Sequence, residues 1–153
     1  MELNPDFQEF LRSFVDHDVR FLIVGGYALA AHGHPRYTKD LDVWVWTDPD
    51  NASRVIEALE DFGFGGLGLS AADFEDPDMV VQLGREPQRI DILTFATGLS
   101  FEQAYAARIT VEIGGVPVPF ISVDDLRTNK LATGRLRDRA DVADLAGTDS
   151  DDP

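Results

Sequence analysis

The chain has 153 residues, of which 44% are hydrophobic and 27% charged, a composition typical of one globular domain with a buried core. Its 28 acidic and 13 basic residues give a net charge of −15, which makes long nucleic acids unlikely as substrates because no strongly basic run offsets the repulsion. The absence of cysteine excludes disulfides, thiolate chemistry and ordinary zinc-finger ligation, and the lack of an apolar run of membrane length predicts a cytoplasmic protein with no membrane contact.

The first part of the chain predicts a helix followed by a strand. Apolar side chains, among them Phe10 and Phe14, recur at helical spacing from residue 5 to residue 17, after Asn4 as N-cap and Pro5 at the first helical position. We expect the aromatic stripe of this helix to pack on a sheet. An apolar strand follows at residues 21–24.

Two glycines follow this strand and precede a short helical run at residues 27–32. Gly25 and Gly26 have no side chain, so their backbone can come close to a phosphate at the start of the helix. We therefore expect Gly25 and Gly26 to cradle a nucleotide phosphate.

A second predicted strand, from Asp40 to Trp46, begins with two carboxylates. Its residues alternate in the order Asp-Leu-Asp-Val-Trp-Val-Trp, which places Asp40 and Asp42 on the same face. Neighbouring carboxylates repel each other and one would keep its proton, a cost that a divalent cation between them removes. Such oxygen ligands suit Mg²⁺ or Mn²⁺, which take substrate phosphates as further ligands. A phosphate cradle beside a carboxylate pair indicates nucleotide chemistry.

The same face also carries Trp44 and Trp46. We expect the start of the strand to face a cleft and its end to be covered by a helix, which makes the tryptophans core residues and not platforms for bases. Just before the Asp pair, Arg36 and Thr38 can reach triphosphate oxygens, although both also fit as polar residues at a strand edge.

A different class of protein, a metal hydrolase, would use histidines. His17, His32 and His34 are candidates, but they lack a spacing on one helix face or strand pair that would converge on a single ion.

The middle of the chain predicts a helix, a loop and a hairpin. An amphipathic helix is expected at residues 52–62 after a turn and cap at residues 48–51, then a flexible Gly-rich loop at residues 62–69 and a short capped turn at residues 70–74. Strands at residues 79–83 and 89–94 follow.

Asp91 lies between two isoleucines on the second of these strands, where a lone charge is costly to bury unless it is paired or metal-bound. A hairpin beside the Asp40 strand would bring Asp91 next to Asp40 and Asp42. The alternative is an ion pair of Asp91 with Arg89 or Arg85.

The last third predicts a capped helix at residues 100–108 and a β-hairpin whose Gly114-Gly115 pair suits a type I′ turn. Pro117 and Pro119 suggest that its second strand lies at a sheet edge. A helix opened by a capping box follows at residues 122–132 and carries Lys130, and a charged helix is expected at residues 137–145. We expect residues 1–147 to form one domain and residues 148–153 an acidic, disordered tail.

The order Val-Gly-Gly, then Arg36-Tyr-Thr38-Lys-Asp40-Leu-Asp42-Val, resembles the signature of the nucleotidyltransferase superfamily that includes DNA polymerase β. Its Arg-x-Thr-x-Asp-Leu-Asp form looks most like small bacterial proteins related to the AbiEii toxin. The resemblance implies an α+β (α/β) fold, a nucleotidyltransferase-like mixed sheet flanked by helices with a C-terminal hairpin and helices. It also implies that Asp91 is the third carboxylate, which binds metal and helps to deprotonate the attacking hydroxyl.

The resemblance further implies an NTP substrate and Mg²⁺ or Mn²⁺ as cofactor. In the relatives the lysine equivalent to Lys130 points toward the nucleotide phosphates, and the threonine of the motif matches Thr38. The acceptor of the nucleoside monophosphate would be a protein, a small molecule or a tRNA end. A role in a toxin–antitoxin or phage-defence pair, with an antitoxin or toxin partner protein, is a further implication.

An alternative from another class is a catalytically inactive nucleotide-binding or partner-binding module on the same fold. The chain is short for this superfamily, in which many members add a helical domain or a partner protein to hold base and acceptor. The presence of all three carboxylates, Asp40, Asp42 and Asp91, favours the enzyme.

Overall fold

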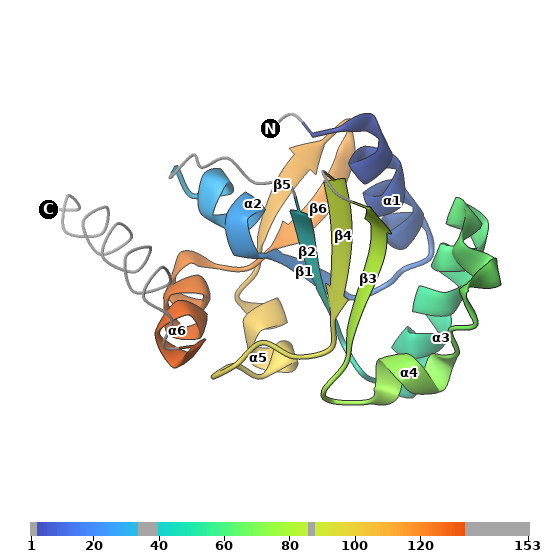
Figure 1. The fold of residues 1–153 in the computed structure, drawn as a ribbon. Helices are drawn as coiled ribbons and strands as arrows, with labels where there is room; N and C mark the ends of the chain where they lie inside the picture. Colours follow the sequence, from blue (N-terminus) through green and yellow to red (C-terminus); the bar gives the residue numbers. More distant parts are fainter. Residues whose placement is uncertain (1–2, 34–39, 86–87, 134–153) are drawn as a thin grey trace, which may run out of the picture.

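The computed structural model describes residues 3–33, 40–85 and 88–133, and it contains one mixed β-sheet with helices on both of its faces (Figure 1). The mixed sheet flanked by helices and ending in a C-terminal hairpin confirms the fold expected from the sequence. The elements are α1 (Pro5–Asp16), β1 (Phe21–Val24), α2 (Gly25–Ala31), β2 (Asp40–Val45), α3 (Pro49–Leu59), the π-helical turn η1 (Glu60–Phe64), the 3-10 turn η2 (Gly65–Leu67), α4 (Ala71–Glu75), β3 (Val80–Arg85), β4 (Gln88–Leu93), α5 (Phe101–Ala106), β5 (Ile109–Ile113), β6 (Val116–Phe120) and α6 (Val123–Thr133).

The strands lie in the order β3-β4-β2-β1-β6-β5. Two pairs are parallel, β2 with β4 and β1 with β6, and the remaining neighbours are antiparallel. Gly114 and Gly115 both have positive φ, 57° and 81°, which is the backbone of the type I′ turn expected between β5 and β6. The hairpin β3–β4 lies beside β2, as the sequence predicted.

One face of the sheet forms the main hydrophobic core with α1. The side chain of Asn4 caps α1 by accepting from Asp6 N, and Pro5 is its first residue, as expected. Phe14 packs its ring on Phe10 at 4.4 Å and edge-to-face on Phe21 of β1 at 5.5 Å. The aromatic stripe of α1 thus attaches the helix to the sheet.

The opposite face is polar at one end of β2 and aromatic at the other. Trp44 is 2% exposed, and its ring meets that of Phe101, the first residue of α5, edge-to-face at 5.1 Å. Trp46 stacks on Phe101 at 6.3 Å. Both tryptophans are therefore packing residues under a helix, as predicted. The carboxylates of Asp40 and Asp42 lie on the same face at the start of β2.

Three expected elements differ in the structure. The helix predicted to begin at Tyr27 begins two residues earlier, because β1 runs directly into α2 at Gly25. The helix predicted at residues 52–62 is α3, which begins at Pro49 and ends at Leu59. The Gly-rich segment forms η1 and η2 instead of a flexible loop, since Phe62 packs edge-to-face on Phe10 at 5.5 Å and thereby fixes the turn.

The prediction of an edge strand from Pro117 and Pro119 is wrong. Their strand, β6, lies between β1 and β5, and β5 is at the edge. The prolines still limit the pairing of β6 with β1. Ile121 donates to Ile23 O at 3.1 Å. In a parallel ladder every second residue donates, so Pro119 and Pro117 would donate next, but neither has an N–H. The ladder between β1 and β6 accordingly contains one residue pair, Ile23 and Phe120.

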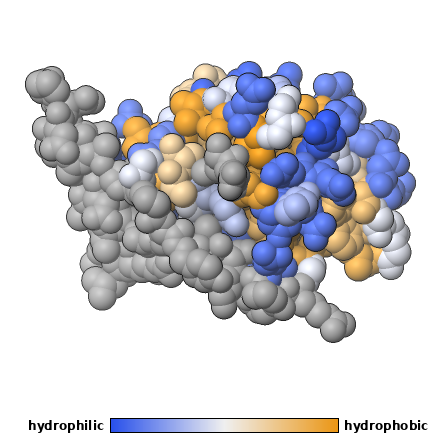
Figure 2. All heavy atoms as spheres, turned by 90° about the horizontal axis from the view of Figure 1, so that it is seen from above, coloured by the Kyte–Doolittle hydropathy of each residue, from blue (hydrophilic) through white to orange (hydrophobic). Residues whose placement is uncertain are grey.

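Several sequence-based expectations lie outside the described residues. These are the helix at residues 137–145 and the tail at residues 148–153, so the domain boundary at residue 147 stays a prediction. No helix among the described residues is long and apolar enough to cross a membrane. Seen from above, hydrophilic residues cover much of the described surface, with hydrophobic residues between them (Figure 2).

Candidate active site

Four charged side chains form a compact group on one face of the sheet. The parallel register of β2 and β4 sets Asp42 directly opposite Asp91 and Asp40 directly opposite Arg89. Since paired residues and residues two apart share a face, all four side chains emerge on the same side. The hairpin β3–β4 thus brings Asp91 beside Asp40 and Asp42, although it lies about fifty residues later in the chain.

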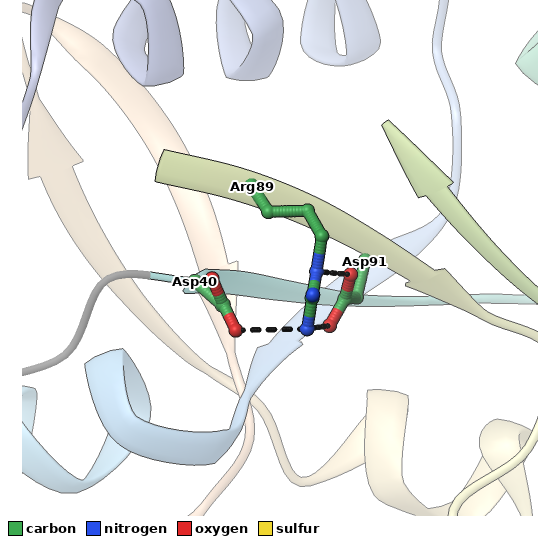
Figure 3. A network of polar contacts seen from close by, with 3 residues as sticks. All are labelled: Asp40, Arg89 and Asp91. Atoms are coloured by element: carbon green, nitrogen blue, oxygen red, sulfur yellow. Dashed lines mark hydrogen bonds and ion pairs between the residues drawn. The ribbon is translucent and has the colours of Figure 1, made fainter. Parts of the chain in front are cut away.

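Arg89 bridges two of the carboxylates (Figure 3). Its Nε donates to Asp91 Oδ1 at 2.8 Å and its Nη2 to Asp91 Oδ2 at 3.3 Å. The same Nη2 donates to Asp40 Oδ2 at 3.0 Å. The side chain of Asp91 is 13% exposed and that of Arg89 26%, so this ion pair is partly shielded from water. The two alternatives weighed for Asp91 therefore occur together: it lies beside the other carboxylates and it pairs with Arg89.

Asp42 has a strongly perturbed pKa. Burial, together with the negative charges of Asp91 and Asp40, raises its pKa to about 7, while Lys130 and Arg89 act in the opposite direction. The cluster therefore favours a proton or another cation at Asp42, which is the electrostatic condition that the sequence led us to expect.

Gly25 lies directly against this carboxylate. Its φ is +70°, and a Cβ placed on it would come within 2.2 Å of Asp42 Oδ2. Only glycine fits here, because both the backbone conformation and the space exclude a side chain. Val24 pairs with Asp42 across β1 and β2, so the first residues of α2, Gly25 and Gly26, begin at the edge of the acidic group.

Lys130 reaches the group from the C-terminal part of the chain. It lies on α6, whose start is capped by Ser122 Oγ accepting from Asp125 N at 3.2 Å, and α6 packs on α2. Lys130 is half-buried and close enough to lower the pKa of Asp42. A cation from α6 thus lies near the Asp42 carboxylate of β2.

Of the other candidate residues, three lie outside the described part of the chain and two make contacts elsewhere. Arg36 and Thr38 lie outside the described residues, as does His34. His17 contacts Ser13 O and Asp61 Oδ2, both at 2.7 Å, whereas His32 contacts Ile121 O at 2.8 Å. In the described part of the chain the histidines therefore serve separate structural contacts and form no shared metal site.

The donor set at the acidic group matches a hard cation in chemical type. Asp40, Asp42 and Asp91 offer carboxylate oxygens of the kind that Mg²⁺ and Mn²⁺ prefer, and the pKa of Asp42 shows that positive charge is favoured there. No three acidic or histidine side chains among the described residues stand in a metal-ligating arrangement. At the acidic group the Arg89 guanidinium lies between Asp40 and Asp91 and donates to both. Metal binding at these residues requires Arg89 to release at least one carboxylate.

The sequence led us to consider Arg89 only as an ion-pair partner of Asp91 and not as a residue of the site. The spacing of two residues on a strand already places both on one face, and this pattern could have identified the arginine as part of the site. Its contact with Asp40 depends on the pairing of β2 with β4, for which no local signal exists.

A family model described as "nucleotidyltransferase of unknown function", DUF6036, matches residues 4–149. No curated protein matches the chain.

Similar solved structures share the fold at low sequence identity. The candidate nucleotidyltransferase TM1012 of Thermotoga maritima is 15% identical with a TM-score of 0.57, the match covering 95% of this chain and 96% of that one. An antigenic nucleotidyltransferase-like protein of Paracoccidioides brasiliensis is 20% identical with a TM-score of 0.57, covering 94% and 76%. The lincosamide antibiotic adenylyltransferase LnuA, solved with lincomycin, is 15% identical with a TM-score of 0.51, covering 94% and 96%.

Proposed function

The chain belongs to the nucleotidyltransferase family DUF6036, and on this premise we propose that it is a metal-dependent enzyme that transfers a nucleoside monophosphate from an NTP to a hydroxyl acceptor. The observation that carries the proposal is the position of Asp91 directly opposite Asp42, with Asp40 on the same face and Gly25 against Asp42. Three carboxylates beside a glycine at a strand–helix junction would bind a cation and a nucleotide phosphate once Arg89 releases a carboxylate.

In the proposed reaction the acceptor oxygen attacks the α-phosphorus, the bond from that phosphorus to the bridging oxygen breaks, and pyrophosphate leaves. Asp40, Asp42 and Asp91 would hold Mg²⁺ or Mn²⁺, which when bound neutralises the triphosphate and stabilises the charge that develops on its oxygens. Asp91 would also take the proton of the acceptor hydroxyl.

The remaining residues bind and orient the nucleotide. The backbone at Gly25 and Gly26 would approach the phosphates, and the ammonium of Lys130 would oppose their charge. Arg36 and Thr38 precede Asp40 in the chain, and we expect them to contact the triphosphate.

The acceptor and the partner protein are proposed only from similarity to other nucleotidyltransferases. LnuA is an adenylyltransferase solved with an antibiotic bound, and a small molecule is accordingly one acceptor class, beside a protein or a tRNA end. The Arg-x-Thr-x-Asp-Leu-Asp motif resembles the AbiEii-related branch, which supports a role in a toxin–antitoxin or phage-defence pair with a partner protein.

Transfer can be measured directly. The protein is incubated with Mg²⁺ or Mn²⁺, each α-labelled NTP in turn and a cell extract, and labelled products are detected. Asp42→Ala removes a carboxylate from the centre of the group, and we expect it to reduce labelling by about 10²-fold or more.

Asp16→Ala is the matched control, because Asp16 is an exposed acid on α1 away from the group. Its labelling should equal that of the unaltered protein. Equal labelling by Asp42→Ala would contradict the proposal.

A second candidate, the catalytically inactive binding module, is favoured by one observation. Arg89 already places a cation between Asp40 and Asp91, so part of the negative charge of the group is offset without metal. A module that binds nucleotide without turnover does not need a metal ion in addition to the Arg89 cation.

Transfer and the metal dependence of nucleotide binding separate the two candidates, and Arg89→Gln tests whether Arg89 competes with metal. In the enzyme, Arg89→Gln should strengthen Mn²⁺ binding to the nucleotide-free protein, because the competing cation is gone. Mn²⁺ or Mg²⁺–NTP should raise the melting temperature of the unaltered protein. If nucleotide raises the melting temperature equally with EDTA present and no transfer is detected, the binding module holds. The binding is measured by calorimetry, with Arg12→Gln as the control for loss of one arginine.

A further inference from the structure

A second concave site lies at the other end of β1 from Gly25. It is a pocket of about 380 Å³, within the usual size range of small-molecule sites, and its lining includes Arg20, Arg54 and Tyr105. Arg20 comes just before Phe21, the first residue of β1, and Phe21 pairs with Val45 of β2. Asp42 lies three residues before Val45 on β2. At about 3.3 Å per residue the two sites are about 10 Å apart along the strand.

The prolines of β6 account for this opening. Pro117 and Pro119 line the pocket, and neither can donate a hydrogen bond to β1. The backbone N–H and C=O of Ile23 point toward β6. Because the direction alternates along a strand, those of Phe21 point the same way, at a position where the ladder between β1 and β6 has ended. The pocket therefore opens where the prolines of β6 donate no hydrogen bond to β1.

Asn51 fixes the backbone of Arg20, and α3 carries Arg54 into the lining of the same pocket. The side chain of Asn51, fully buried in the first turn of α3, accepts from Arg20 N at 2.7 Å and donates to Arg20 O at 3.1 Å. Arg54 follows Asn51 by three residues and so lies on the same side of α3, next to Arg20. The guanidinium of Arg20 rests 5.4 Å from the ring of Trp46 and 5.9 Å from that of Tyr105.

The charge at this pocket is opposite in sign to that of the whole chain. Within the described residues neither Arg20 nor Arg54 forms an ion pair with an acidic side chain. Arg108 does not line the pocket, but its guanidinium lies 4.0 Å from the centroid of the Tyr105 ring. One acid, Asp18, belongs to the lining. In a protein of net charge −15, arginines gathered without acidic partners favour an anionic ligand.

We propose that this pocket is a binding site for a small phosphomonoester, with Arg20 and Arg54 holding the phosphate and Tyr105 and the prolines contacting the rest of the molecule. Guanidinium groups recognise phosphate through paired N–H donors, and the flat apolar surfaces of tyrosine and proline suit a sugar or another small carbon skeleton. The site is separate from the acidic group and does not depend on the proposed transfer reaction.

The test is an NMR titration of the full-length ¹⁵N-labelled protein in EDTA, which suppresses cation-dependent binding at the acidic group. Inorganic phosphate, ribose 5-phosphate and AMP are added in turn, and the Nε–Hε signals of Arg20 and Arg54 are followed. We expect saturable shifts of both signals, with tighter binding of at least one monoester than of inorganic phosphate. Asp42→Ala should leave these shifts unchanged.

Arg54→Gln should weaken this binding at least tenfold, and Arg54→Glu should abolish it, whereas Arg12→Gln should have no effect. Amide spectra of each variant show whether it remains folded. Shifts that grow linearly and match those caused by equal ionic strengths of sodium chloride would overturn the proposal. Unchanged affinity in the folded Arg54→Gln protein would overturn it as well.

Discussion

Burial and the repulsion of neighbouring acids both act on the side chain of Asp42. Its side chain is largely buried, faces two other acids and touches the backbone of Gly25, so its ionised form lacks water and meets like charges. Lys130 and Arg89 offset this only in part, and the pKa stays at about 7. A single residue thus makes the group a place where a proton or a cation is bound.

Replacing Asp42 should stabilise the protein in a pH-dependent way. The pKa is raised from 3.8 to about 7 in the folded state, so between these values the folded protein binds more protons than the unfolded chain, and the free energy of unfolding falls as pH rises. Asn has the shape of the protonated acid and carries no charge. We expect Asp42→Asn to gain up to about 4 kcal/mol at pH 8 and little at pH 4.

Urea unfolding at pH 4, 6 and 8 in EDTA measures this gain. Asp16→Asn provides the control, because it removes an exposed acid from α1. A gain for Asp42→Asn that is equal at all three pH values would show that its charge is not responsible.

At the scale of elements, Asn51 joins a helix to two strands. Asp48 caps α3 by accepting from Asn51 N at 3.3 Å, which leaves the Asn51 side chain to accept from Arg20 N and to donate to Arg20 O and to Trp46 O at 2.8 Å. It therefore satisfies backbone groups where β1 begins and where β2 has ended, and it sets α3 against both.

Asn51→Ala should cost about 2–4 kcal/mol of stability, because it removes three hydrogen bonds, although Arg20 O still accepts from Trp46 N. Ser53→Ala, on the exposed side of the same helix, should change stability by less than about 0.5 kcal/mol. Thermal and urea unfolding of both variants measure the difference. A cost for Asn51→Ala as small as that of Ser53→Ala would mean that other groups or water replace its hydrogen bonds.

At the scale of the whole molecule, charge is unbalanced. The 28 acidic and 13 basic residues repel one another on average more than they attract, and this repulsion acts against the compact state. The shielded pairs of Arg89 with Asp40 and Asp91 are local exceptions.

Screening should therefore stabilise the protein. Raising the salt concentration from about 10 mM to about 100 mM shortens the Debye length from about 30 Å to about 10 Å, and we expect the melting temperature to rise by several degrees at pH 8. Sodium and potassium chloride should act equally, since screening does not depend on the ion. A melting temperature that falls with salt would show that attractive pairs dominate.

Much of the fold follows from local patterns in the sequence. Helical spacing of aromatic residues predicted α1, alternation predicted β2, and the Gly114-Gly115 pair predicted the turn between β5 and β6. The errors arose where distant contacts override local signals. Phe62 orders a Gly-rich segment by packing on Phe10, and β6 is internal despite its prolines because β5 covers its other edge.

For the candidate site, the sequence by itself determined that Asp40 and Asp42 share a face and that Gly25 precedes them, since these relations depend only on strand alternation and chain order. Only the tertiary structure decided that Asp91 lies opposite Asp42, that Arg89 bridges Asp91 to Asp40, and that two arginines from different elements meet in a pocket at the far end of β1. The physical reason is that strand register and helix packing are set by the burial of the whole core, and no local stretch of sequence carries that information.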